Sequence, residues 1–369
     1  MKFTCEKQIL SNALTIVSRA IPVKTTMSIL QCVLVEANAE GIRFTANDME
    51  LGIETVVEGQ VEEPGIVAIE EKIFHEIVRK LPEGEIRLTV DPSLKVTIQS
   101  GRSKFNLIGR STEEFTYLPT VERIDSIRMT QLSLKNVISQ TIFSTKNDET
   151  NKMMGGELIQ IDQDTFKMVS LDGHRISIRR LHLASSYAPR KVVVPAKTLD
   201  DISRILPDSA ENQVSLTFTG KHMVFDFDRT TVISRLLEGE FYAIDQMLSS
   251  DFETKMTINR HEFLDCLDRT TLLVKENDKK PVILNITDEQ MSLKIRSTIG
   301  SFDEEIEVEK QGKDLMIGFN PRFLLDAMRA IEDETVDFYF VNPKAPCFIK
   351  DTEDKYIYLI LPVNFTVVD

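Results

Sequence analysis

Three stretches of the chain carry apolar residues at the spacing of an amphipathic helix, and each follows a short apolar strand. The strands begin at Val67, Val192 and Leu315. The apolar positions of the helices are Phe74, Ile77, Val78 and Leu81, then Leu199, Ile202 and Leu206, then Leu324, Ala327, Met328 and Ile331. A stripe of this period predicts a surface helix that packs against a core.

The opposite face of each predicted helix carries two cations that lie 7 positions apart and therefore on the same side. Their positions repeat every 125 residues (197 − 72 and 322 − 197): Lys72, Lys197 and Arg322, then Arg79, Arg204 and Arg329, with the acids Glu76, Asp201 and Asp326 between them. In one helix this pattern would indicate a solvated charged face. Its recurrence indicates three equivalent modules that present the same cationic face to the same ligand, with the acids partly neutralising the cations.

The rest of each third repeats one plan. An opening strand and helix span residues 3–20, 129–143 and 256–274, and Asn259 is a suitable N-cap for the third helix. Strands of alternating apolar and polar residues follow, as in half-buried antiparallel sheets. The pattern predicts an α+β protein of three repeated modules, each with two helices and antiparallel sheets. Short polar stretches at 121–126 and 249–253 place the modules at 1–125, 126–252 and 253–369.

Composition narrows the possible classes of protein. Of the 369 residues, 42% are hydrophobic, which is enough for several cores. The sequence has no apolar run that would span a bilayer, and its N-terminus lacks a signal-peptide core, so a cytoplasmic location is predicted. The four cysteines are scattered, and no disulfide framework is expected. A net charge of −14 opposes nucleic-acid binding on average, but cations can still gather on one surface.

Motifs for catalysis are missing from the sequence, which has no G-x-S-x-G, no P-loop and no dinucleotide-binding G-x-G-x-x-G. His75-Glu76 and His261-Glu262 begin like zinc-protease motifs, but Arg79 and Asp265 stand where the second histidine would be. The alternating acids at 303–309 favour a strand with an acidic outer face over a metal site. No catalytic residue, metal site or cofactor is therefore predicted.

Two further stretches are distinctive. Leu171-Asp172-Gly173-His174-Arg175-Ile176 predicts an Asp-Gly turn between two strands. Residues 356–365 predict a closing core strand that Pro362 interrupts. An alternative for this second stretch is the wall of a groove whose exposed apolar end receives a peptide.

The threefold repeat, the segment 171–176, Gly101-Arg102-Ser103-Lys104-Phe105, Gly318-Phe319-Asn320 and Leu361-Pro362-Val363 together make the chain resemble the bacterial DNA polymerase III beta subunit, the sliding clamp. The resemblance covers the whole chain. It implies that two chains associate head to tail into a closed ring of six modules around duplex DNA. Such a ring binds DNA without sequence preference and tethers the replicative polymerase for processivity, with no catalytic activity of its own.

The repeat register and the resemblance together name DNA-facing residues. By register these are Lys72, Arg79, Lys197, Arg204, Arg322 and Arg329, and by resemblance they include the loop residues Lys24 and Lys279. The resemblance also implies a dimer seam that pairs the strand of Phe105 and Leu107 with a region near Leu272 and Leu273 of the other chain. Arg102 and Lys104 would then face the acidic strand at 304–309.

The resemblance further implies one peptide pocket per chain, for which the clamp loader, polymerases and repair proteins compete with short linear motifs. Its wall would include Met154, Leu171, Gly173, His174, Arg175, Ile176, Tyr242, Met247, Phe323, Ile360, Leu361, Pro362 and Val363. Tyr242 stands where the family commonly has proline, and Asn364 where it commonly has arginine, so the resemblance leaves the fine specificity open. Two other classes also stay open: a hydrolase or transferase with its site at Asp172, His174 and Arg175, and a purely structural repeat protein.

Overall fold

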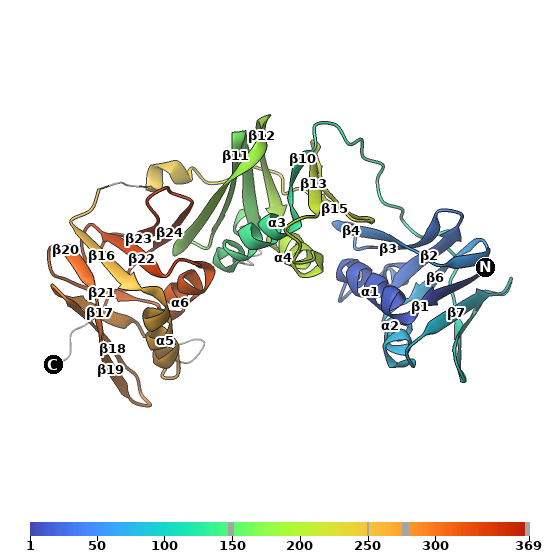
Figure 1. Cartoon of the computed structure of the whole chain (residues 1–369), viewed down its shortest axis with the longest axis horizontal. Helices are drawn as coiled ribbons and strands as arrows, with labels where there is room; N and C mark the ends of the chain where they lie inside the picture. The colour runs from blue at the N-terminus through green and yellow to red at the C-terminus, as the bar shows by residue number, and fades with distance from the viewer. Residues whose placement is uncertain (147–150, 249–250, 275–279, 366–369) are drawn as a thin grey trace. The chain divides into compact units, whose positions relative to one another are not determined.

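The computed structural model describes residues 1–146, 151–248, 251–274 and 280–365 (Figure 1). Contacts divide the chain into two compact units. Unit 1 contains residues 1–134 and 201–236, and unit 2 contains residues 135–200 and 237–369. The chain leaves unit 1 for unit 2 within helix α3 (Gln131–Ser139) and returns to unit 1 within helix α4 (Ala196–Ile205). No cis peptide bond occurs among the described residues.

Unit 1 has two antiparallel sheets within the described residues, with strand orders β5-β1-β7-β8-β9 and β10-β13-β14-β15-β4-β3-β2-β6. Helix α1 packs against α2 beside these sheets (Figure 1). The elements are β1 (Lys2–Glu6), α1 (Lys7–Val17), β2 (Cys32–Asn38), β3 (Gly41–Asn47), β4 (Leu51–Val57), β5 (Gln60–Glu63), β6 (Gly65–Glu70), α2 (Glu71–Lys80), β7 (Glu85–Val90), β8 (Lys95–Ser100), β9 (Ser103–Ile108), β10 (Ile127–Thr130), β13 (Gln213–Phe218), β14 (His222–Phe227) and β15 (Thr230–Arg235).

Unit 2 likewise has two antiparallel sheets in its described part, with orders β11-β12-β24-β23-β22-β16-β20 and β19-β18-β17-β21. Helix α5 packs against α6 (Figure 1). The elements are β11 (Gly156–Leu171), β12 (Arg175–Pro195), β16 (Thr254–Asn259), α5 (Arg260–Thr271), β17 (Val282–Ile286), β18 (Gln290–Arg296), β19 (Ser301–Glu307), β20 (Glu309–Gly312), β21 (Leu315–Phe319), α6 (Pro321–Ala330), β22 (Thr335–Phe340), β23 (Cys347–Lys350) and β24 (Tyr356–Ile360).

The three predicted cationic helices are confirmed as α2, α4 and α6. Their apolar stripes are buried, as Phe74, Leu199 and Leu324 show with no exposed surface. The predicted cap is also present, because the side chain of Asn259 accepts a hydrogen bond from the backbone N–H of Glu262 at 3.1 Å. Helix formation in these segments follows from local pattern and capping.

Strand lengths differ from the sequence prediction in two places. β11 and β12 form one long hairpin, so the segment 192–195 is the end of β12 rather than a separate strand. The acidic strand expected over 303–309 is divided at Val308. Here the chain leaves β19, which pairs with β18, and enters β20, which pairs with β16 in the other sheet. Ile306 and Val308 are buried and Glu305, Glu307 and Glu309 exposed, so the acidic alternation continues through the point where the chain changes sheets.

Two sheets run through the borders of the predicted repeats. In unit 1, β15 pairs with β4, and in unit 2, β24 pairs with β12. Edge strands of successive repeats therefore complete each other's ladders, which removes exposed edges at these places. The module boundaries after residues 125 and 252 stay predictions.

The predicted closing strand is confirmed, because β24 is buried and ends at Ile360, before Pro362. None of the described helices is long and apolar enough to cross a membrane. The cysteines Cys5, Cys32, Cys266 and Cys347 are buried and unbridged. The Cys5 thiol is part of the core, and its burial raises its pKa to about 11.

Candidate DNA-facing helices and peptide groove

The cations of the three helices are mostly solvent-exposed. Lys72, Arg79, Lys197, Arg204 and Arg329 are exposed, and Arg322 is half-buried in the first turn of α6. The loop residue Lys24 is also exposed, whereas Lys279 lies outside the described residues. Burial of the apolar stripes thus turns these charged faces away from their own cores.

The acids of the repeat behave differently from one another. Glu76 lies 3.8 Å from Arg79 and 3.4 Å from Lys80, as neutralisation of the helix cations requires. Asp326 instead pairs with Arg175 of the β11–β12 turn, with 2.6 Å between Nη1 and Oδ2. Asp201 is buried and lies 3.8 Å from Arg19. Asp326 and Asp201 thus also have partners outside their own helices, and for these two acids neutralisation of the helix cations stays a prediction.

The turn between β11 and β12 is closed by the carboxylate of Asp172. It accepts hydrogen bonds from the backbone N–H groups of His174 at 2.9 Å and Arg175 at 3.1 Å, and from Arg175 Nε at 2.9 Å. Gly173 has a φ of 87°, a conformation that glycine adopts without strain. The predicted Asp-Gly turn is thus confirmed, and its aspartate has a structural role.

Arg175 connects this turn to two other elements of unit 2. Its guanidinium pairs with Asp326 on α6 and donates to the backbone carbonyl of Phe143. It also lies 4.4 Å from the ring centroid of Phe323 and 5.4 Å from that of Phe143. Because its side chain is only 10% exposed, these contacts replace most of its hydration.

The C-terminal segment lies along the same turn. Arg175 pairs with Ile360 in the ladder, and the N–H of Leu361 donates to the carbonyl of His174 at 2.8 Å. Two residues on, the N–H of Val363 donates to the carbonyl of Gly318 at 2.8 Å. A Cβ on Gly318 would lie 2.9 Å from the carbonyl oxygen of Val363, so glycine is needed for this close approach.

The predicted pocket residues thus gather around one turn and one chain end of unit 2. Leu171, Ile176 and Ile360 are buried. Met154, Arg175, Tyr242, Phe323, Pro362 and Val363 are half-buried, whereas Gly173, His174, Met247 and Leu361 are exposed. Leu171 and Ile176 share an apolar cluster with Met154 and Tyr242, and the His174 ring lies 6.2 Å from that of Phe323. Met247 has half of its surface exposed.

Sequence reasoning missed three participants here: Phe143, Gly318 as a packing residue, and Asp326 as the partner of Arg175. Gly318 had a signal, because a glycine inside an apolar strand marks close backbone approach. Asp326 and Phe143 had none, since their roles depend on contacts with residues far away in the chain.

The predicted dimer surfaces include two sheet edges and the turn after α5. β9, at the edge of its sheet, carries Phe105 at 41% exposure and Ile108 at 87%, with Arg102 and Lys104 exposed nearby. β19 is also an edge strand, and Leu272 in the same unit is 78% exposed. Glu304 on β19 is already paired with Arg269, 2.9 Å away. Open edges with exposed apolar side chains are suited to pairing with another chain.

These features define a class: an α+β protein built from repeated sheet-and-helix units, with cationic helix faces and unpaired sheet edges. Family models match nearly the whole chain. Residues 1–119, 128–242 and 245–364 match the N-terminal, central and C-terminal domains of the DNA polymerase III beta subunit. The chain belongs to the DNA polymerase III beta subunit family.

Individual relatives agree with this assignment. The Staphylococcus epidermidis beta sliding clamp is 30% identical over 375 aligned residues, which cover 99% of each chain. The crystal structure of the Bacillus subtilis sliding clamp is 30% identical with a TM-score of 0.95, over 99% of this chain and 100% of that one. A crystal structure from Eubacterium rectale assigned to the same subunit is 56% identical, also with a TM-score of 0.95, over 99% of this chain and 100% of that one.

Proposed function

We propose that this chain is a sliding clamp, of which two copies close head to tail into a ring around duplex DNA and keep a replicative polymerase on its template. The observation that carries the proposal is the recurrence of α2, α4 and α6, with exposed cations at one register, in a chain of this family. Cations that meet phosphates bind DNA without regard to sequence. The ring is then retained by closure, and weak contacts leave it free to slide. A cytoplasmic location, where the DNA is replicated, belongs to the same proposal.

The DNA contacts in this proposal are Lys24, Lys72, Arg79, Lys197, Arg204, Lys279, Arg322 and Arg329. The pairing of Glu76 with Arg79 weakens one of these contacts, which favours weak binding that lets the ring slide over tight binding. The net charge of −14 discourages DNA from binding to the other surfaces.

The predicted pocket residues around Arg175 are proposed to form a groove, called the groove beside Arg175, that receives short linear motifs of the clamp loader, polymerases and repair proteins. Leu361 and His174 are exposed, and Met154 and Tyr242 are half-buried, so apolar and polar side chains of this group are both within reach of a peptide. Methionine adapts to several partners because its side chain is flexible.

We also propose that the chain has no catalytic activity of its own. The rival enzyme hypothesis needs Asp172 and Arg175 to act on a substrate. Asp172 is instead occupied by three N–H donors of its own turn, and Arg175 is held by Asp172 and Asp326. This arrangement supports a scaffold rather than a reacting group.

For the dimer we propose that β9, with Arg102, Lys104, Phe105 and Leu107, pairs with the β19 edge and the region of Leu272 and Leu273 in the second chain. Joining two edges satisfies their backbone groups, and one contact of this kind at each end closes a ring.

Small-angle X-ray scattering in moderate salt tests the ring. The expected result is twice the chain mass of 42.0 kDa with the distance distribution of a hollow particle. A compact monomer at all concentrations would contradict the proposal.

Salt-dependent binding to a labelled duplex tests the helix faces. Changing Arg79, Arg204 and Arg329 to Glu together should weaken binding and make it less steeply dependent on salt, by about 0.9 in slope for each lost phosphate contact. The matched control changes three exposed lysines outside these helices, Lys95, Lys221 and Lys344, to Glu. Equal effects of the two triple variants would show that net charge, not the helix faces, controls binding.

A further inference from the structure

A second turn in the chain repeats the geometry of the turn at Asp172. The carboxylate of Asp48 accepts from the backbone N–H groups of Glu50 at 3.0 Å and Leu51 at 2.7 Å, as Asp172 accepts from the residues two and three positions on. Met49 has a φ of 78° where Gly173 has 87°. By this register Met49 corresponds to Gly173, Glu50 to His174 and Leu51 to Arg175.

The strand beside each turn is equivalent as well. Leu51 pairs with Ser234 of β15, as Arg175 pairs with Ile360 of β24. The N–H of Arg235 then donates to the carbonyl of Glu50 at 2.8 Å, as that of Leu361 donates to His174 at 2.8 Å. Unit 1 therefore contains the same backbone frame on which, in unit 2, the proposed groove beside Arg175 is built.

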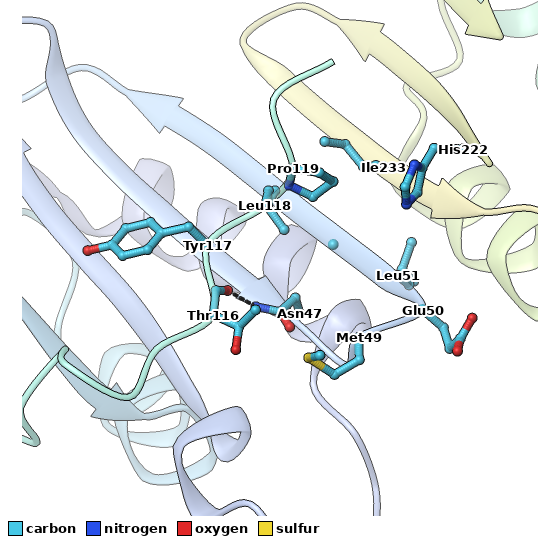
Figure 2. Close-up of a pocket in the computed structure, with 11 residues that line it drawn as sticks. Asn47, Met49, Glu50, Leu51, Thr116, Tyr117, Leu118, Pro119, His222 and Ile233 are labelled. Carbon is cyan, nitrogen blue, oxygen red and sulfur yellow. Dashed lines mark hydrogen bonds between the residues drawn. The ribbon is translucent and has the colours of Figure 1, made fainter. Parts of the chain in front are cut away.

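A hollow of about 270 Å³ lies at this frame in unit 1 (Figure 2). Its wall is formed by the segment Thr116–Pro119, which is tied down by a 2.6 Å hydrogen bond from Asn47 Nδ2 to the carbonyl of Thr116. Leu118 fills the space above Gly52, where a Cβ would lie 2.1 Å from Leu118 Cδ2. The wall is thus built into the fold, and glycine at position 52 is required for it.

A second hollow, of about 410 Å³, adjoins the first and shares Pro119 and His222 with it. Together they make an elongated groove rather than a single closed pocket. Its edges carry large apolar side chains in solvent: Met49 at 54% exposure, Tyr117 at 58% and Ile124 at 62%. Exposed apolar groups that gather along one groove, instead of scattering over the surface, mark a binding site.

The charged residues that line this groove are acidic. Among the described residues that line the two hollows, Glu50 and Glu122 are the charged ones, and no Lys or Arg lines either. Glu50 is 64% exposed and forms a surface ion pair with Arg235, 3.6 Å away, which is weak enough for a peptide cation to share the carboxylate. The position of cationic Arg175 is taken by apolar Leu51.

We infer that the groove of unit 1, lined by Met49, Glu50, Leu51, Tyr117, Pro119 and His222, binds an extended peptide segment of a partner protein that has apolar side chains next to lysine or arginine. Apolar side chains would enter the two hollows, and a cation would meet Glu50 at the rim. The inference rests on the proposed function only for the comparison with the groove beside Arg175. It gives the chain a second peptide site with a different lining, so the two sites would select different partners.

The probe for this inference is a fluorescein-labelled peptide Gly-Lys-Leu-Phe-Lys-Gly, measured by fluorescence anisotropy with the full chain at about 0.15 M salt, where screening limits unspecific charge attraction. Two control peptides replace Leu-Phe by Ala-Ala or both lysines by glutamates. Wild-type protein should bind the probe at least about tenfold more tightly than either control, since each lost apolar anchor or reversed charge pair costs about a factor of five to ten.

Two groove variants and two matched controls locate the site. Glu50→Lys should weaken the probe about tenfold and improve binding of the acidic peptide, and Tyr117→Ala should weaken the probe about fivefold. Glu85→Lys changes the total charge equally on an exposed strand position elsewhere in unit 1, and Leu361→Ala alters the groove beside Arg175. Both controls should leave binding within about twofold of wild type.

Three results would overturn the inference: no binding at millimolar probe, equal binding of the Ala-Ala peptide, or loss of binding with Leu361→Ala instead of the groove variants. The last would place the peptide in the groove beside Arg175. None of these results would contradict the proposed clamp function, which is tested by the mass of the particle in solution and by salt-dependent DNA binding.

Discussion

Replacing Arg175 by alanine should destabilise unit 2 by about 3–5 kcal/mol, the usual cost of breaking a largely buried ion pair. The guanidinium bonds to Asp172 at 2.9 Å and to Asp326 at 2.6 Å, and it lies on the ring of Phe323. The side chain of Asp172 is 11% exposed and that of Asp326 is 32% exposed. Water therefore hydrates Asp326 in part after the change, whereas Asp172 keeps its two backbone donors, which places the loss near the lower end of the range.

The loss should have a characteristic dependence on Asp326. In the wild type, Asp326→Asn removes one partner of Arg175 and should cost about 1–2 kcal/mol. In the Arg175→Ala background the same change should stabilise the chain, because it removes a carboxylate that has lost its cation. Arg175→Lys keeps the charge but not the forked geometry, so it should recover only part of the loss.

Urea unfolding followed by circular dichroism measures these free energies, and hydrogen exchange of the β11–β12 hairpin shows whether the loss is local to unit 2. Arg180→Ala is the matched control: it is on the same strand, but among the described residues its side chain donates to the exposed carbonyl of Asp354 and not to a carboxylate. If Arg175→Ala cost no more than Arg180→Ala, or if Asp326→Asn were destabilising in both backgrounds, the central role of Arg175 would be refuted.

Three further changes test other parts of the structure. Burial raises the pKa of Glu157 from 4.5 to about 8, so between these pH values the folded chain holds a proton that the unfolded chain has released, and the stability of the fold falls as pH rises through this window. Glu157→Gln should therefore leave urea unfolding nearly unchanged at pH 5 and stabilise the chain by about 1–3 kcal/mol at pH 8.5. Equal effects at the two pH values would contradict this. Phe105→Asp should convert dimer to monomer in sedimentation, because it places a charge on the β9 edge, and an unchanged dimer would exclude this seam. Asn259→Ala should cost about 1 kcal/mol in thermal unfolding and Asn259→Asp much less, since aspartate keeps the cap of α5; equal losses would argue against capping.

Local features of the chain were predictable from the sequence because they depend on neighbours within a few residues. The helices α2, α4 and α6 follow from apolar spacing, the turn at Asp172 from its Asp-Gly pair, and the cap at Asn259 from its position before a helical stretch. Which residues belong to the candidate peptide groove came from resemblance to a family and not from spacing. The structure brings most of these residues together, and their role stays a prediction.

Other features were decided only by tertiary structure, because they depend on which distant segments meet. The role of Asp326 is one: in the repeat it matches Glu76 and Asp201, yet it pairs with Arg175, 151 positions away. The crossing from one sheet to the other at Val308 is another, because it depends on the strands that pair with β19 and β20. The sequence by itself determined a threefold α+β repeat with cationic helix faces, since burial of apolar stripes leaves the charged sides outward. The groove of unit 1 could not be predicted from the sequence, because the acidic and apolar residues that line that groove meet only when β15 pairs with β4.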